Sequence, residues 1–211
     1  LEDAFHTEYD EQGVNREAAP GYHLYNYLLW SDVEQRVTAE NDSFQGLSEI
    51  LTKARQSLVQ LTDPNGNLIQ IGDTAPNTRL GKIAEYDDVR YVLTSGAEGR
   101  IPSSNFTIYD SGYILGRSGW GDNARSFADE FFYNLRFGKQ GIHGHNDMAS
   151  LILHALGEPI LIDAGKYGYV ANSERRHCVG RSAHNTLTVS GATESEAVSY
   201  THLTLPTKRI V

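Results

Sequence analysis

The residues best suited to chemistry gather in one glycine-flanked segment, residues 141–147 (GIHGHND). It places His143, His145 and Asp147 at alternate positions. In an extended chain such residues point to the same side, about 6.5–7 Å apart. Two imidazoles at this separation suit either two metal ligands or one ligand beside one catalytic base. We therefore expect His143 and His145 to be functional.

Two further residues of metal-binding type stand at the ends of predicted strands. Asp163 ends the apolar run LID, and His184 begins the segment HNTLTV. Zinc binds imidazole nitrogen and carboxylate oxygen in tetrahedral geometry, so two histidines and one aspartate make a credible site. His154 differs, because it lies inside an apolar segment, where a histidine is typically a buried structural residue. We expect a structural role for it.

The elements that must position these residues fall into two halves, of which the first is helical. The periodicity predicts helices over residues 17–37, 43–61 and 86–93, with Pro20 in a first turn and Asp42 as an N-cap. The second helix carries one apolar stripe: Phe44, Leu47, Ile50, Leu51, Ala54, Leu58 and Leu61. Without neighbouring helices this stripe would be exposed, so we expect the chain alone to associate or aggregate.

After residue 100 the pattern changes to short apolar or alternating segments separated by glycine-containing turns. The predicted strands are residues 105–109, 113–117, 130–137, 150–156, 159–163 and 185–189. Strands so closely spaced, without helices between them, favour an antiparallel sheet or sandwich. Residues 199–211 fit neither pattern and read as adapter-derived, non-native sequence.

Composition excludes several classes of protein. The net charge of −9, from 27 acidic and 18 basic residues, argues against a general nucleic-acid binder. Residues 131–191 differ, with six basic against four acidic residues and five of the eight histidines. Cys178 is the single cysteine, which excludes an internal disulfide, and no apolar run approaches the roughly 18 residues that a membrane span requires. The oligomeric state is not predicted.

The order of the motifs resembles the heparinase II/III-like polysaccharide lyases. The resemblance rests on HGHNDMASLILHALGEPILIDAGKYGY followed by RSAHNTLTV, and upstream on FTIYDSGYILGRSGW and DEQGVNREAAPGYHLYNYLL. It covers roughly residues 8–191. Members of this family pair an (α/α) toroid with an antiparallel β-sandwich, and they cleave uronate-containing polysaccharides by β-elimination.

The resemblance implies a multidomain α plus β protein in which both domains are truncated. Residues 1–99 would be the last helices of the toroid, residues 100–198 an incomplete sandwich, and residues 199–211 the non-native tail. The chain begins Leu1-Glu2-Asp3, without an initiator Met or a leader, which predicts a piece of a longer protein. By resemblance, that protein is periplasmic or secreted.

The resemblance also assigns roles to single residues. Tyr22, in Pro-Gly-Tyr-His, matches the catalytic tyrosine, and His143 matches the catalytic histidine; Tyr169 lies near a second tyrosine that some members use. The residue that neutralises the substrate carboxylate would lie before Leu1. The ligands of a structural Zn²⁺ would be His145, Asp163 and His184. The implied activity is that of a carbon–oxygen lyase on an anionic polysaccharide such as heparan sulfate or alginate.

Two other interpretations stay open. His143, His145 and Asp147 also fit the HxHxD pattern of metallo-β-lactamase-like hydrolases, although Met148 stands where that pattern continues with histidine. That class also expects an alternating β/α order, which is missing. The third interpretation is a non-catalytic carbohydrate-binding sandwich. Product absorbance separates the three, because only a lyase creates a conjugated C4–C5 double bond.

Overall fold

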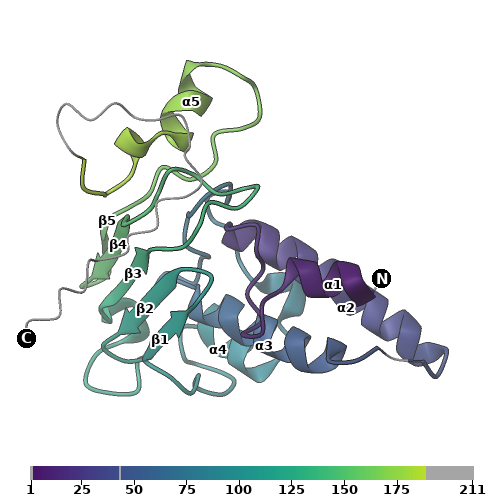
Figure 1. Cartoon of the computed structure of the whole chain (residues 1–211). Helices are drawn as coiled ribbons and strands as arrows, with labels where there is room; N and C mark the ends of the chain where they lie inside the picture. The colour runs from purple at the N-terminus through teal and green to yellow at the C-terminus, as the bar shows by residue number, and fades with distance from the viewer. Residues whose placement is uncertain (1, 43, 189–211) are drawn as a thin grey trace, which may run out of the picture.

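The computed structural model describes residues 2–42 and 44–188 of the chain. A helical N-terminal part lies beside a five-stranded sheet, and a short further helix stands beyond one end of the sheet (Figure 1). The described residues form one sheet, so the second sheet of a sandwich is not visible among them. A toroid is not visible in this arrangement either. The tail predicted over residues 199–211 lies outside the described residues.

Four α-helices form the N-terminal part: α1 (Glu2–Glu8), α2 (Pro20–Ala39), α3 (Leu47–Gln60) and α4 (Asp87–Leu93). The three predicted helices are all present. Pro20 opens α2, where the missing N–H costs nothing because the first turn leaves that donor unpaired. The prediction of Asp42 as an N-cap is wrong, since α3 begins four residues later after Gly46, whose φ is 77°. The seven-residue α1 is too short to show a period in the sequence.

The apolar stripe of α3 is buried rather than exposed. Leu47, Leu51 and Leu58 are 4%, 3% and 0% exposed, and they belong to one hydrophobic core shared by the helices and the sheet. Aggregation through an uncovered stripe is therefore not expected from these side chains. α2 and α4 cover it by packing on α3, and the sheet shares the same hydrophobic core.

The sheet has the order β1-β2-β3-β4-β5 and every neighbouring pair is antiparallel. Its strands are β1 (Phe106–Tyr109), β2 (Tyr113–Arg117), β3 (Phe132–Arg136), β4 (Leu151–Ala155) and β5 (Glu158–Leu161). Each agrees with a predicted strand to within two residues at either end. The sixth prediction is wrong over residues 185–188, which form no strand, and Val189 lies outside the described residues.

A half-buried arginine joins the sheet to the end of α3. Arg117, at the end of β2, donates hydrogen bonds to the backbone carbonyls of Gln60 and Thr62. Its guanidinium lies 3.9 Å from the ring centroid of Trp120. Carbonyls at a helix C-terminus have no partner within the helix, so this contact satisfies them and fixes the helices against the sheet. Burial lowers the pKa of Arg117 to about 9.

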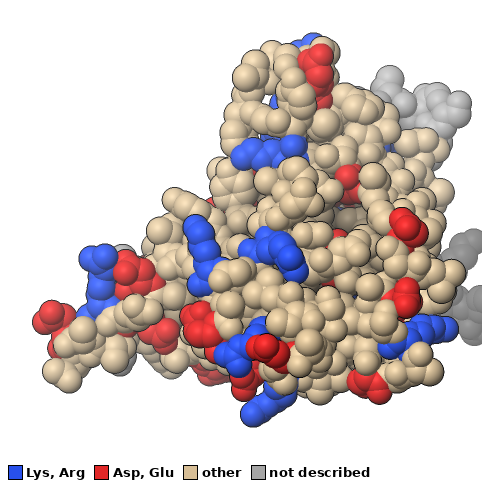
Figure 2. Space-filling model, turned by 180° about the vertical axis from the view of Figure 1, so that it is seen from behind, with Lys and Arg blue, Asp and Glu red and all other residues tan. Residues whose placement is uncertain are grey.

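Charged side chains of both signs are interspersed over the lower part of the face seen in Figure 2, while its upper part is mostly uncharged. Among the helices that the structure describes, none combines the length and apolar character needed to cross a lipid bilayer.

Candidate functional site

The loop between β3 and β4, which carries His143, is held against two segments of the helical part. The N–H of His143 donates to the carbonyl of Glu17 at 3.1 Å, and the N–H of Asp73 donates to the carbonyl of His143 at 2.8 Å. A Cβ at Gly141 would lie 2.5 Å from the carbonyl carbon of Glu17, and one at Gly72 would lie 2.5 Å from the carbonyl oxygen of His143. These backbones approach so closely only because both positions are glycine.

Tyr22 lies in the first turn of α2 and stacks on His143. The two ring centroids are 3.4 Å apart and the ring planes differ by 8°. The N–H of Gly21 donates to the hydroxyl of Thr74 at 3.0 Å, which anchors the start of α2 beside Asp73. Tyr22 is half-buried, so its side chain is not a core aromatic but covers the imidazole.

Tyr169 completes a group of three acid–base side chains. Its hydroxyl is hydrogen-bonded to that of Tyr22 and lies 3.5 Å from Nδ1 of His143. The ammonium group of Lys166 lies 4.3 Å from the centroid of its ring. Burial, the hydrogen bond with Tyr22 and the negative charge of Asp73 raise the pKa of Tyr169 above its usual value. Its phenol therefore stays protonated at neutral pH.

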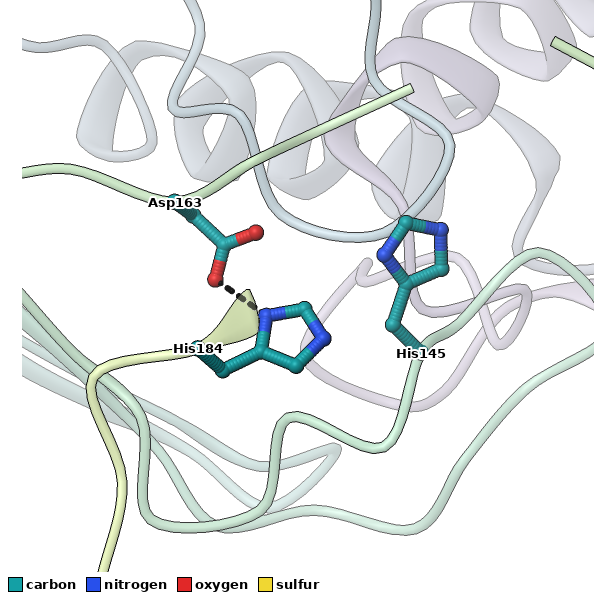
Figure 3. A group of neighbouring side chains, drawn as sticks. All are labelled: His145, Asp163 and His184. Atoms are coloured by element: carbon teal, nitrogen blue, oxygen red, sulfur yellow. Dashed lines mark hydrogen bonds and ion pairs between the residues drawn. The ribbon is translucent and has the colours of Figure 1, made fainter. Parts of the chain in front are cut away.

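A second cluster contains the three predicted metal ligands. His145, Asp163 and His184 are 1%, 4% and 8% exposed, and one possible ligand atom from each lies within 4.8 Å of the others. Figure 3 shows that the three side chains come from three separate segments and converge on one point. Asp163 follows β5 and accepts the N–H of Gly165 at 3.1 Å. His184 follows a 3₁₀ turn instead of opening a strand, which corrects the prediction.

The donor set of this cluster fits a zinc ion. Nδ1 of His145 and Nε2 of His184 are buried without a hydrogen-bond partner among the described residues. A buried polar atom without a partner is costly, and a metal ion would use both lone pairs. The other nitrogen of His145, Nε2, lies 3.1 Å from Asp73, and a carboxylate in that position orients the imidazole of a metal site. Nδ1 of His184 lies 2.7 Å from Asp163, which is itself a residue of the cluster.

The electrostatics of His184 reflect its carboxylate neighbours. Burial would lower its pKa, but the hydrogen bond with Asp163 and the nearby charge of Asp147 outweigh that effect, and the pKa is raised. The carboxylates thus favour positive charge at this point, and a divalent cation would supply it.

Asp147, the last residue of the alternating pattern, does not belong to the cluster. Its carboxylate is buried, and Oδ1 lies 3.8 Å from Nε of Arg136, which is itself fully buried. The guanidinium of Arg136 donates to the carbonyls of Gly112 at 2.8 Å and Lys139 at 2.7 Å. Burial raises the pKa of Asp147, and the charge of Arg136 opposes that rise. This arrangement gives Asp147 a role in holding the loop and does not favour the HxHxD hydrolase.

Asp73 was missed by the sequence analysis. It lies in the connection between α3 and α4, is 3% exposed, and faces His143 at 3.4 Å and His145 at 3.1 Å. Burial opposes its ionisation, but hydrogen bonds from Arg175 and the two histidines prevail and lower its pKa to about 2. Nothing in its spacing links it to the histidines; its position after Gly72 in a turn is the only local signal.

Arg175 was also missed as a site residue. It lies in α5 (Ser173–Val179), a helix that the sequence analysis did not predict, and its backbone N–H is capped by the side chain of Asn172 at 2.9 Å. Its guanidinium donates to both oxygens of Asp73, one of them at 3.0 Å. This hydrogen-bonded pair connects α5 to the helical part of the molecule.

His154 lies apart from both clusters. It is 7% exposed within β4, and its Nε2 is 3.9 Å from a carboxylate oxygen of Asp63. Its ring packs edge-on against Phe132 at 6.0 Å. Burial lowers its pKa, so the imidazole stays neutral inside the fold. The prediction of a structural histidine is confirmed.

Comparison with protein families and solved structures gives one consistent result. Residues 110–204 match the family described as Heparinase II/III-like, C-terminal. No curated protein matches the sequence. Among solved structures, a heparan sulfate lyase HepC mutant from Pedobacter heparinus is similar with a TM-score of 0.75 and 21% identity, over 89% of this chain and 31% of that one.

Two heparinase III structures are similar to the same extent. One, the BT4657 gene product, has a TM-score of 0.75 and 19% identity over 89% of this chain and 31% of that one. The other has a TM-score of 0.72 and 20% identity over 89% and 34%. These likenesses show a shared fold, and the chain spans only 31% to 34% of the length of the three structures. The match over residues 110–204 identifies that part of the chain as a heparinase II/III-like C-terminal domain.

Proposed function

We propose that this protein is a polysaccharide lyase that cleaves a uronate-containing polysaccharide by β-elimination. The single observation that carries the proposal is the convergence of Tyr22, His143 and Tyr169, which come from three distant segments and touch one another. Acid and base groups placed side by side are what elimination requires. The family match over residues 110–204 supports the same reaction class.

The reaction removes the proton on C5 of the uronate and expels the oxygen on C4. The C5–H and C4–O bonds break, a C4–C5 double bond forms, and the departing oxygen gains a proton. The C5 proton is weakly acidic, so the neighbouring carboxylate must be neutralised or hydrogen-bonded as charge develops. A base then takes the C5 proton and an acid protonates the leaving oxygen.

We assign the base to His143 and the acid to Tyr22. An imidazole has a reference pKa near 6.5 and accepts a proton readily at neutral pH, whereas a phenol near 10 keeps its proton and can donate it. Tyr169 is the supporting donor, because its raised pKa keeps it protonated beside the hydroxyl of Tyr22.

We also propose that His145, Asp163 and His184 hold one Zn²⁺. Two imidazoles and one carboxylate are ligand types that zinc accepts, and two of the ring nitrogens have no hydrogen-bond partner within residues 2–42 and 44–188. Bound zinc would supply a cross-link between three loops. His145, two residues after His143, would then keep the catalytic loop in place.

The proposed substrate is an anionic polysaccharide, of the heparan sulfate or alginate type. The similar structures are described as heparan sulfate lyase and heparinase III, which favours heparan sulfate as the first substrate to test. The positively charged Lys166 lies against the ring of Tyr169, and its charge would attract a polyanion. A periplasmic or secreted location would suit this substrate.

The test is an elimination assay on the purified full-length protein with heparan sulfate and with alginate. A rise in near-ultraviolet absorbance from the unsaturated product is the expected result. New reducing ends without that absorbance would indicate a hydrolase and contradict the proposed lyase. Binding of the polymer without any cleavage would favour the non-catalytic carbohydrate-binding protein.

A further inference from the structure

We propose that Asp73 is a shared positioning residue, which sets the orientation and tautomer of both His143 and His145 and so couples the catalytic histidine to the metal ligand. The inference rests on the proposed function for the role of His143. For His145 it rests on the geometry of the metal cluster.

The carboxylate of Asp73 stands between the two histidines. Oδ1 lies 3.1 Å from Nε2 of His145, and Oδ2 lies 3.4 Å from Nδ1 of His143. The side chain of Asp73 is only 1% exposed, so water does not compete for these contacts. The backbone N–H of Asp73 also donates to the carbonyl of His143 at 2.8 Å, which fixes the distance between the two residues.

A carboxylate that only accepts hydrogen bonds determines which nitrogen of each ring carries the proton. A neutral imidazole has one N–H and one lone pair, so the nitrogen that faces Asp73 must be the donor. In His145 this leaves the lone pair on Nδ1, a buried nitrogen that has no hydrogen-bond partner in the described part of the chain and faces the metal cluster. In His143 it leaves the lone pair on Nε2, free to accept the proton from C5.

The other carboxylate near His143 does not compete for this role. Oε2 of Glu17 lies 3.7 Å from Nε2 of His143, beyond hydrogen-bonding distance. Arg175 holds Asp73 in place by donating to both carboxylate oxygens, so each oxygen serves one histidine and the arginine together. One buried carboxylate thus leaves the lone pair on Nδ1 in His145 and on Nε2 in His143.

Asp73→Asn is the principal test, in the full-length protein. An amide offers one acceptor oxygen and one donor NH₂, so it cannot accept from both histidines. We expect the zinc dissociation constant, measured by competition with a chromogenic chelator, to rise about 10- to 100-fold. At saturating zinc we expect kcat to fall about tenfold or more while KM changes little.

Asp63→Asn is the matched control, because Asp63 is also a buried aspartate near a histidine but lies outside the site. It should change neither zinc affinity nor kcat. Arg175→Met is a second variant that leaves the carboxylate in place, and it should also weaken zinc binding. Arg175→Lys should have a zinc affinity between those of Arg175→Met and the wild type. Melting temperatures identify any variant that has not folded.

The outcomes separate this inference from the proposed function. If the protein eliminates no uronate polymer, the proposed function fails, but the zinc affinities still test Asp73. Wild-type zinc affinity in Asp73→Asn would overturn the inference. A kcat loss that excess zinc restores completely would also overturn it, because Asp73 would then serve the metal site alone.

Discussion

The rings of Tyr22 and His143 lie parallel, with centroids 3.4 Å apart, although one residue opens a helix and the other lies in a loop of the sheet part. This stack forms the contact between the two halves of the molecule at the candidate active site. It depends on the backbone hydrogen bonds between residues 17, 73 and 143, which bring the loop to the start of α2.

Tyr22→Phe should lose activity without losing structure. The substitution removes only the phenolic oxygen, so the stack on His143 is retained. We expect kcat to fall by about 10²- to 10⁴-fold with KM nearly unchanged, because a general acid acts in the transition state. Tyr25→Phe is the control, since Tyr25 is an exposed tyrosine of the same helix. Equal activity of the two variants in the absorbance assay would remove Tyr22 from the proposed mechanism.

His143→Ala and His145→Ala should fail in different ways, although the residues stand two positions apart. We expect His143→Ala to retain about one zinc per chain and its melting temperature while kcat falls about 10²- to 10⁴-fold. His145→Ala should lose zinc and melt at a lower temperature, because metal binding contributes to folding stability. Elemental analysis and thermal melting give both readouts. If His143→Ala also loses its zinc, both residues are ligands, and the metal-hydrolase interpretation is then favoured over the lyase.

Asp147→Asn should destabilise the protein and leave its zinc in place. The substitution leaves the fully buried Arg136 without its charged partner, and breaking such a pair costs on the order of 3 kcal/mol. We expect a lower free energy of unfolding in denaturant and unchanged zinc stoichiometry. Loss of zinc from this variant would instead indicate that Asp147 is a ligand, as the HxHxD pattern requires.

His23 should make the protein less stable in acid. Burial lowers its pKa to about 3 in the folded state, against about 6.5 when unfolded. Folding therefore favours its neutral form, and above pH 6.5 its titration does not reduce the free energy of unfolding. That free energy falls by about 1.4 kcal/mol per pH unit as the pH decreases from 6.5 toward 3.

His23→Leu tests this prediction, because it removes the titrating group from a site where neither ring nitrogen has a hydrogen-bond partner among the described residues. We expect its free energy of unfolding to fall less steeply between pH 6.5 and pH 4 than that of the wild type. His6→Gln, at an exposed position of α1, is the control and should follow the wild-type profile. Identical slopes for His23→Leu and wild type would refute the assignment.

The sequence by itself predicted α2, α3 and α4, five strands and the three residues of the second cluster. The period of α3 and the alternation of β3 are local signals, because each element's own side chains must form one buried face. The motif residues His145, Asp163 and His184 were recognised from the resemblance, and they lie together in the structure. The expected Zn²⁺ itself stays a prediction.

Only the tertiary structure decided how the two halves meet. The burial of Leu58, the pairing of Asp147 with Arg136 and the position of Asp73 between two histidines all depend on segments that are distant in the chain. No pattern of spacing records such contacts. An aspartate in a turn has the same local sequence whether it faces water or is buried against two imidazoles. Packing of the complete core decides which of these occurs.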